Sequence, residues 1–156
     1  MKHFKLKHFT FLFLLLLSLS SCNSTRTALF DQYSYEKTIE LKVETINLMN
    51  KALTPYSTNR NDIENLALNI EKLIEYEKNK PNNEITFEMW KVLNGKEKNL
   101  VAGFFKKWET KEVLSKPFIE ESQKQILEAF DLLIQYEIKK DKESKDNLLQ
   151  IINLNT

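Results

Sequence analysis

Hydrophobic side chains recur with the period of an α-helix along most of the chain after residue 32. Between residues 33 and 53 they are spaced by three or four positions, which places them on one face of a helix. This helix should end at Thr54, because a residue that precedes a proline, here Pro55, is pushed out of the helical region. The stripe consists of Tyr35, Ile39, Val43, Ile46, Met49 and Leu53.

The next apolar stripe predicts a second helix after Asn61, whose side-chain oxygen can cap the first turn. The segment NKPNN, residues 79–83, is the clearest turn in the chain and ends this helix. The stripe includes one charged position and consists of Ile63, Leu66, Ile70, Leu73 and Glu77.

Two shorter helices are predicted next. The first is capped by Thr86 and stops at Asn94-Gly95, a typical helix end. The second starts near Asn99 and ends before Ser115. Their apolar faces carry Phe87, Trp90 and Leu93 in the first, and Val101, Phe104, Phe105 and Trp108 in the second.

The longest predicted helix starts at Pro117, because proline favours the first turn of a helix. Acidic residues follow this start and lysines lie near residue 140, which suits the two ends of the helix dipole. Its stripe consists of Ile119, Ile126, Phe130, Leu133 and Ile138. A last helix, capped by Ser144, would bury Leu148, Ile151 and Ile152.

These segments predict an all-α fold, because none of them alternates as a strand does. Residues 33–156 should form one antiparallel four-helix-type bundle with a short extra helix and a C-terminal helix, since each amphipathic helix must bury its stripe. Residues 73–77, LIEYE, resemble residues 133–137, LIQYE. Duplication of a helical hairpin would produce this likeness, and so would chance among residues that are common in helices.

The N-terminus has a different pattern. Three lysines precede an apolar run from Phe9 to Leu19, which is about half the length that spans a bilayer. Small residues then precede Cys22, the only cysteine in the chain. The sequence Leu19-Ser20-Ser21-Cys22 resembles the lipobox of bacterial lipoproteins.

The resemblance implies that diacylglycerol is attached to the Cys22 sulfur and that the chain is cut just before it. Residues 1–21 would then be a signal peptide and residues 22–32 a lipidated tether. Because Asn23 rather than an aspartate follows the cysteine, the resemblance implies an outer-membrane lipoprotein that faces the periplasm. The acyl chains would hold it at that membrane.

Composition then excludes several kinds of chemistry. His3 and His8 are the only histidines and both precede the expected cleavage site, while lipidation would consume the thiol of Cys22. A mature domain without them cannot build a Ser-His-Asp or Cys-His site, or the usual zinc site. Removal of three lysines leaves 20 basic and 22 acidic residues, a net charge of −2 that gives no reason to expect nucleic acid. We therefore expect no catalysis, cofactor or metal.

An aromatic and basic stretch at residues 90–111 is the candidate surface for contact with a partner or lipid. Lysines next to amphipathic aromatic rings can hold anionic headgroups or an acidic partner. In the alternative interpretation, the aromatic residues fill the core and the lysines face solvent. Gly103 in this stretch marks either close packing of another backbone or a frayed helix. The candidate residues are Trp90, Phe104, Lys106, Lys107 and Trp108.

Together these features predict a lipid-anchored bundle that binds another macromolecule and performs no covalent chemistry. The expected partner is an envelope protein, or a toxin that this protein would inhibit as an immunity factor. The alternative is a carrier that holds a small ligand or lipid inside the bundle. An enclosed apolar cavity of several hundred Å³ would favour the carrier, and an exposed apolar patch with a charged rim would favour the binding module.

Overall fold

The computed structural model describes residues 27–155, so the expected signal peptide and Cys22 lie outside the described residues. Helices make up all the regular structure in this range, and no strand occurs in it, which confirms the all-α prediction. Two short 3-10 turns, Lys51–Leu53 and Tyr56–Thr58, connect the first two helices. The six α-helices are α2 (Gln32–Asn50), α3 (Arg60–Lys78), α4 (Glu84–Leu93), α5 (Val101–Lys111), α6 (Lys116–Lys139) and α7 (Lys142–Asn155).

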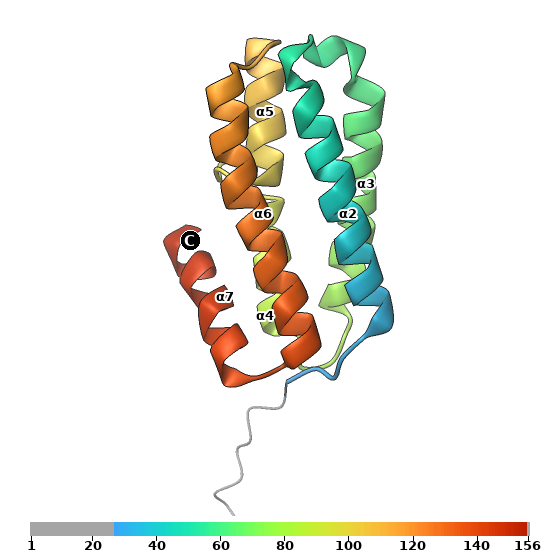
Figure 1. Ribbon diagram of the computed structural model, residues 1–156. Helices are drawn as coiled ribbons and strands as arrows, with labels where there is room; N and C mark the ends of the chain where they lie inside the picture. The colour runs from blue at the N-terminus through green and yellow to red at the C-terminus, as the bar shows by residue number, and fades with distance from the viewer. Residues whose placement is uncertain (1–26, 156) are drawn as a thin grey trace, which may run out of the picture.

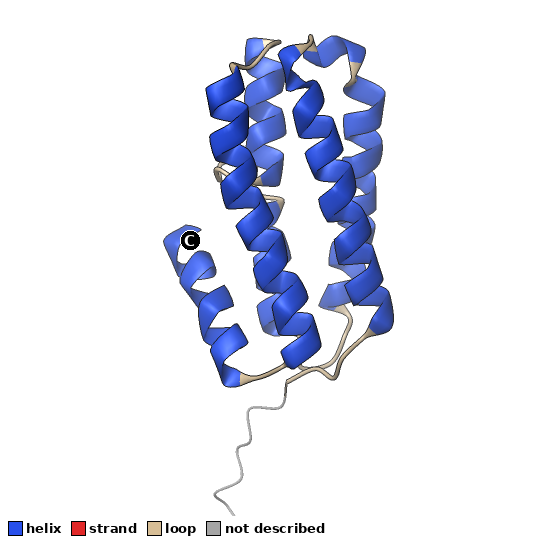
Figure 2. Cartoon of the chain, viewed as in Figure 1, coloured by secondary structure: helices blue, strands red, loops and turns tan. Residues whose placement is uncertain are grey.

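The helices form an elongated bundle in which α2 and α3 run in opposite directions, as do α6 and α7, whereas the neighbours α4 and α7 run in the same direction (Figures 1 and 2). Helix α2 packs against α3 and α6, while α4 packs against α3, α6 and α7. In Figure 1, α4 and α5 occupy the lower and upper halves of the bundle, with the break at residues 94–100 between them. The chain enters at the lower end, where α3 and α6 also end and α4 and α7 begin. We call this the basal end.

The buried face of α2 differs from the predicted stripe. Val43 and Leu53 are each 53% exposed, so their prediction as core residues is wrong. The small hydroxyl side chains of Ser34, Thr38 and Thr45 lie on the buried face of α2 in their place. Because these residues count as polar, the hydrophobic pattern indicated a different face. The buried residues of α2 are Ser34, Thr38, Leu41, Thr45, Leu48 and Met49.

The stripes of α3 and α6 agree more closely with the prediction. All five predicted positions of α3 are buried, including the charged Glu77. In α6 the prediction is confirmed except at Ile138, which is exposed because the buried face of the last turn is formed by Tyr136 and Glu137. In the last helix Leu148 and Ile152 are buried and Ile151 is partly buried.

The predicted helix caps are displaced by a few residues. Asn59 rather than Asn61 occupies the N-cap position of α3, and Asn83 rather than Thr86 occupies that of α4. At the start of α7, the Asp141 carboxylate accepts a hydrogen bond from the Ser144 amide at 2.9 Å. Neither Asn59 nor Asn83 makes a capping hydrogen bond through its side chain.

Gly103 allows close packing of two backbone segments. A Cβ atom at this position would lie 1.6 Å from the carbonyl oxygen of Lys98. The connection between α4 and α5 therefore lies directly against the first turn of α5. This contact confirms close packing as the reason for the glycine.

Candidate functional site at the basal end and on the side of the bundle

The aromatic members of the predicted contact surface lie in the core. Trp90 and Trp108 have no exposed surface and Phe104 has almost none. The Trp90 ring packs edge-on against Phe130, with centroids 5.9 Å apart. The Trp108 indole nitrogen donates hydrogen bonds to two backbone carbonyl oxygens, each at 3.0 Å. The core interpretation therefore holds for these three residues, and a partner cannot reach them in this fold.

The basic members lie on the outer face of α5. Lys106 and Lys107 are both exposed. Lys106 forms an ion pair of 2.5 Å with Glu97, and the Lys107 ammonium lies 4.4 Å from the centroid of the Phe118 ring. Of the predicted contact residues, these two alone are accessible.

Lys106 borders a groove of about 440 Å³ between α3 and α5, which we call the α3–α5 groove. Buried apolar side chains from both helices form its floor, and exposed charged side chains form its rim. Ala67 is exposed inside the groove. The floor consists of Ile63, Leu66, Ile70, Val101 and Phe105. The rim carries Glu64, Glu71, Lys96, Lys106 and Glu109.

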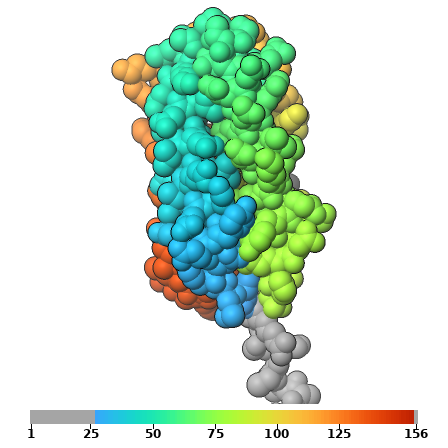
Figure 3. Space-filling model, turned by 90° about the vertical axis from the view of Figure 1, so that its right-hand side faces the viewer, coloured from blue at the N-terminus to red at the C-terminus, as the bar shows by residue number. Residues whose placement is uncertain are grey.

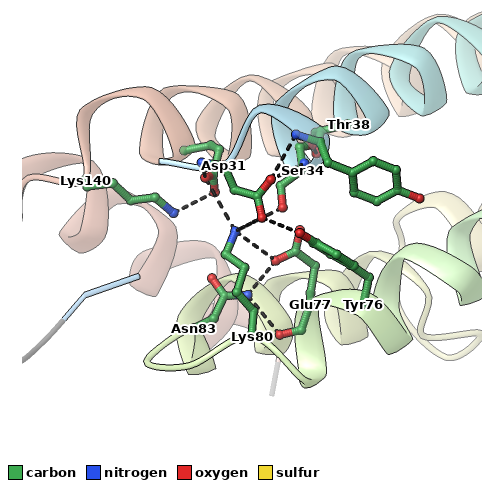
Figure 4. Close-up of polar contacts among 10 residues, drawn as sticks. Asp31, Ser34, Thr38, Tyr76, Glu77, Lys80, Asn83 and Lys140 are labelled. Atoms are coloured by element: carbon green, nitrogen blue, oxygen red, sulfur yellow. Dashed lines mark hydrogen bonds and ion pairs between the residues drawn. The ribbon is translucent and has the colours of Figure 1, made fainter. Parts of the chain in front are cut away.

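A second feature, at the basal end, is a set of ionised side chains around Lys80 (Figure 4). The Lys80 side chain is only 12% exposed. Its ammonium donates a hydrogen bond to the Ser34 hydroxyl at 3.0 Å. It also lies 3.4 Å from Asp31, 3.5 Å from Glu137 and 3.6 Å from Glu77. One cation thus joins three carboxylates that belong to different parts of the bundle.

Further hydrogen bonds complete this charged cluster. Lys140 binds the Glu137 carboxylate at 2.6 Å. The Tyr76 hydroxyl donates to Asp31 at 2.6 Å. The cluster therefore contains three carboxylates and two ammonium groups, with neutral donors that share the excess negative charge. Its members are Asp31, Ser34, Tyr76, Glu77, Lys80, Asn83, Glu137 and Lys140.

The pKa shifts follow from these contacts. Burial lowers the pKa of Lys140 below its ordinary value, and the bond to Glu137 only partly offsets this effect. Burial of Asp31 disfavours its ionised form. The hydrogen bonds from Tyr76 and from the Ser34 amide, together with the charge of Lys80, outweigh burial and hold the pKa of Asp31 below its ordinary value. The same hydrogen bond raises the pKa of Tyr76 to about 12, because only the neutral hydroxyl can donate.

The sequence contains a signal for this cluster that the helical stripes do not reveal. Two segments that contribute residues to the cluster share the form Tyr-Glu-x-x-Lys, at residues 76–80 and 136–140. These segments extend the likeness noted between residues 73–77 and 133–137, and both lie at helix ends. Sequence reasoning placed Glu77 on a buried stripe but missed its partners, because lysines and acids near helix ends ordinarily face water.

The chain segment before α2 is held against the basal end. Ala28 is buried and its amide donates to the Asn82 carbonyl oxygen at 2.9 Å. Asp31 caps α2 by accepting hydrogen bonds from Tyr33 and Ser34, at 2.9 and 3.3 Å. A hollow of about 490 Å³ lies between residues 27–32 and residues 80–82. The backbone of this segment is therefore fixed at both of its ends.

We next ask whether the described residues could hold a metal ion or cross a membrane. Between residues 27 and 155, no group of three or more histidine, cysteine or acidic side chains is placed to hold a metal ion. No helix in the same range has the length and hydrophobicity needed to cross a membrane. In the charged cluster, the carboxylates of Asp31, Glu77 and Glu137 each face a lysine, as in an ion cluster that holds segments together.

No protein-family model matches this chain, and comparison with curated proteins and with solved structures gives no match either. The class of the protein follows from its own structure. It is an all-α bundle with an open groove on its side and a buried charged cluster at its basal end.

Proposed function

We propose that this protein is a lipid-anchored, noncatalytic interaction module of the bacterial envelope that binds a protein partner in the α3–α5 groove. Acyl chains on Cys22 would hold it at the outer membrane, on the periplasmic side. The partner would be an envelope protein, or a toxin that this protein inhibits as an immunity factor. The observation that carries the proposal is the apolar floor of the groove with its charged rim.

The groove has the composition expected of a binding surface for a protein. The floor side chains are already largely buried, so a partner would cover the exposed Ala67 and the small part of the floor that faces solvent. Burial of that apolar area would favour association. The acids and lysines on its rim would set the orientation of the partner, since such charges contribute more to specificity than to affinity. The carrier alternative has less support, because this groove is open to solvent and a carrier needs an enclosed apolar cavity.

Site-specific photo-crosslinking in the native envelope tests this proposal. A photoreactive residue at Ala67 points into the groove, whereas one at the neighbouring Leu68, which is 49% exposed and lies outside the groove, serves as the control. We expect a specific protein adduct from position 67 and none from position 68. A second substitution at Ala102, which also lines the groove, should abolish the adduct at position 67 when arginine replaces the alanine. Equal adducts from both positions, or none from either, would contradict the proposal.

The anchoring part of the proposal has a separate test. Mass spectrometry of the protein purified from membranes should show diacylglycerol on Cys22 and no residues before it. Retention of residues 1–21, or an unmodified thiol in the membrane fraction, would contradict lipidation. The control is a Cys22→Ala chain, which should carry no diacylglycerol.

A further inference from the structure

Large apolar side chains collect on the outside of the basal end. Leu29 is 87% exposed and Phe30 is 49% exposed, and both lie in the segment that precedes α2. Tyr33 and Tyr76 are also exposed there, and their rings lie 4.7 Å apart between the first turn of α2 and the last turn of α3. Ile138 is exposed at the end of α6. We call these five residues the basal surface.

The basal surface is held in place by the charged cluster. Asp31 follows Phe30 directly, and its amide donates to the Glu137 carboxylate at 2.7 Å. Ala28 precedes Leu29 directly, and its amide is bonded to Asn82. The side chains of Leu29 and Phe30 therefore project from a backbone that is fixed on each side. Figure 3 shows this N-terminal segment, in blue, at the lower edge of the molecule.

The length of the chain before residue 27 determines what this end of the bundle meets. Five residue steps separate Cys22 from Thr27, and a fully extended chain covers at most about 3.6 Å per step, or roughly 18 Å. The far end of the bundle is more distant, because the 24 residues of α6 alone span about 36 Å. An anchor on Cys22 would therefore keep the basal end, and not the far end, next to the bilayer.

The chemistry of the basal surface suits the bilayer interface. Exposed leucine and phenylalanine side chains partition into the boundary between headgroups and acyl chains. Tyrosine is enriched at the headgroup level, where one end of the ring is apolar and the other is hydrated. Lys139 and Lys142 are exposed at the same end, where α6 ends and α7 begins, and they can contact anionic phospholipid headgroups.

We propose that the basal surface docks onto the phospholipid bilayer, with Leu29 and Phe30 inserted at the interface and Tyr33 and Tyr76 at headgroup level. This inference rests on the lipid anchor of the proposed function and adds to it a fixed orientation. The lipid chains on Cys22 supply attachment, and the charged cluster supplies a rigid base. The bundle then keeps one orientation relative to the membrane and does not rotate about its lipidated segment.

The test uses the full chain, expressed with its signal and reconstituted into vesicles of phosphatidylethanolamine and phosphatidylglycerol with brominated acyl chains. A Phe30→Trp variant places a fluorescent reporter on the basal surface. A Val113→Trp variant, at an exposed position next to the far end of α5, is the matched control. Trp90 and Trp108 are fully buried and contribute the same background to both variants.

We expect brominated lipid to quench the Phe30→Trp emission about twofold more than that of Val113→Trp, because bromine quenches only on contact with the acyl boundary. Equal quenching of the two variants on protein shown by mass spectrometry to be lipidated would overturn the docking proposal and leave anchoring intact. An unmodified Cys22 would overturn both. A further variant, Leu29→Ser with Phe30→Trp, should lose most of the quenching while it stays lipidated and folded.

Discussion

The backbone amide of Asp31 donates a 2.7 Å hydrogen bond to the carboxylate of Glu137, although the two residues are 106 positions apart in the chain. This bond joins the point where the chain enters the bundle to the last turn of α6. The Glu137 carboxylate lies almost fully buried, where an ionised group needs partners. Lys80 and Lys140 supply them and neutralise the buried charge, while the amide of Asp31 fixes the entry segment to the same carboxylate.

Replacement of the central lysine should be costly. The substitution Lys80→Met keeps most of the side-chain volume but leaves buried carboxylates without their shared cation, which costs about 3–5 kcal/mol when a buried ion pair is broken. Urea denaturation measures this loss. The control is Lys78→Met, since Lys78 pairs with Glu75 on the surface at 3.2 Å and such pairs contribute about 0–1 kcal/mol. Similar losses in both variants would contradict a structural role for the cluster.

The hydrogen bond from Tyr76 to Asp31 predicts a pH dependence. The pKa of Tyr76 is about 12 in the folded protein and 10.0 ordinarily, so the folded state holds the phenolic proton more tightly. Its contribution to stability is complete below pH 10 and is lost as the pH rises from 10 to 12.

Tyr76→Phe should therefore show a smaller fall in the free energy of unfolding over this range than the wild type. The difference in ultraviolet absorbance between the two proteins during titration reports the ionisation of Tyr76 itself. A midpoint near pH 10 in that difference would show that the hydroxyl is not bonded to Asp31.

Replacement of Gly103 by alanine should lower the stability of the protein, which is opposite to the effect expected from helix propensity. Alanine in a helix is favoured over glycine by about 1 kcal/mol. At this position its Cβ would collide with the Lys98 carbonyl oxygen, so we expect Gly103→Ala to destabilise the protein by about 1–3 kcal/mol, as overpacking does. Thermal unfolding measures the effect. Gly95→Ala is the control, because its nearest contact is the flexible Lys98 side chain, and an equal loss there would contradict the explanation.

One buried hydroxyl should be replaceable with a gain in stability. The Thr45 side chain is fully buried on α2 and its oxygen has no hydrogen-bond partner. Thr45→Val removes this group with little change in shape and should stabilise the protein by about 1 kcal/mol in chemical denaturation. Thr38→Val is the matched comparison, because the Thr38 hydroxyl donates to the Ser34 carbonyl oxygen at 2.7 Å and should give no such gain. A loss at position 45 would indicate that its hydroxyl is bonded.

The parts of the fold that sequence reasoning predicted are those governed by local periodicity. The stripe of α3 was complete because aliphatic side chains occupy nearly every buried position. The stripe of α2 was misplaced because Ser34, Thr38 and Thr45 are buried without being hydrophobic. Local pattern cannot identify such a face, since the burial of a hydroxyl side chain depends on the helices that pack around it.

The two surface features were harder to predict for different reasons. The α3–α5 groove depends on how far two helices stand apart, which no single stripe determines. The charged cluster depends on the convergence of Asp31, Lys80 and Glu137 from three separate segments. The repeated Tyr-Glu-x-x-Lys spacing was its one visible sign.

The position of the groove along α3 has a consequence for what it can reach. Ala67 lies eleven residues before Lys78, the last residue of α3, which at 1.5 Å per residue is a height of about 17 Å above the basal end. With that end on the bilayer, the groove would open sideways and clear of the headgroups. The lower half of the bundle would then hold the groove at this distance from the membrane. The groove would bind only partners that extend to the same height above the bilayer.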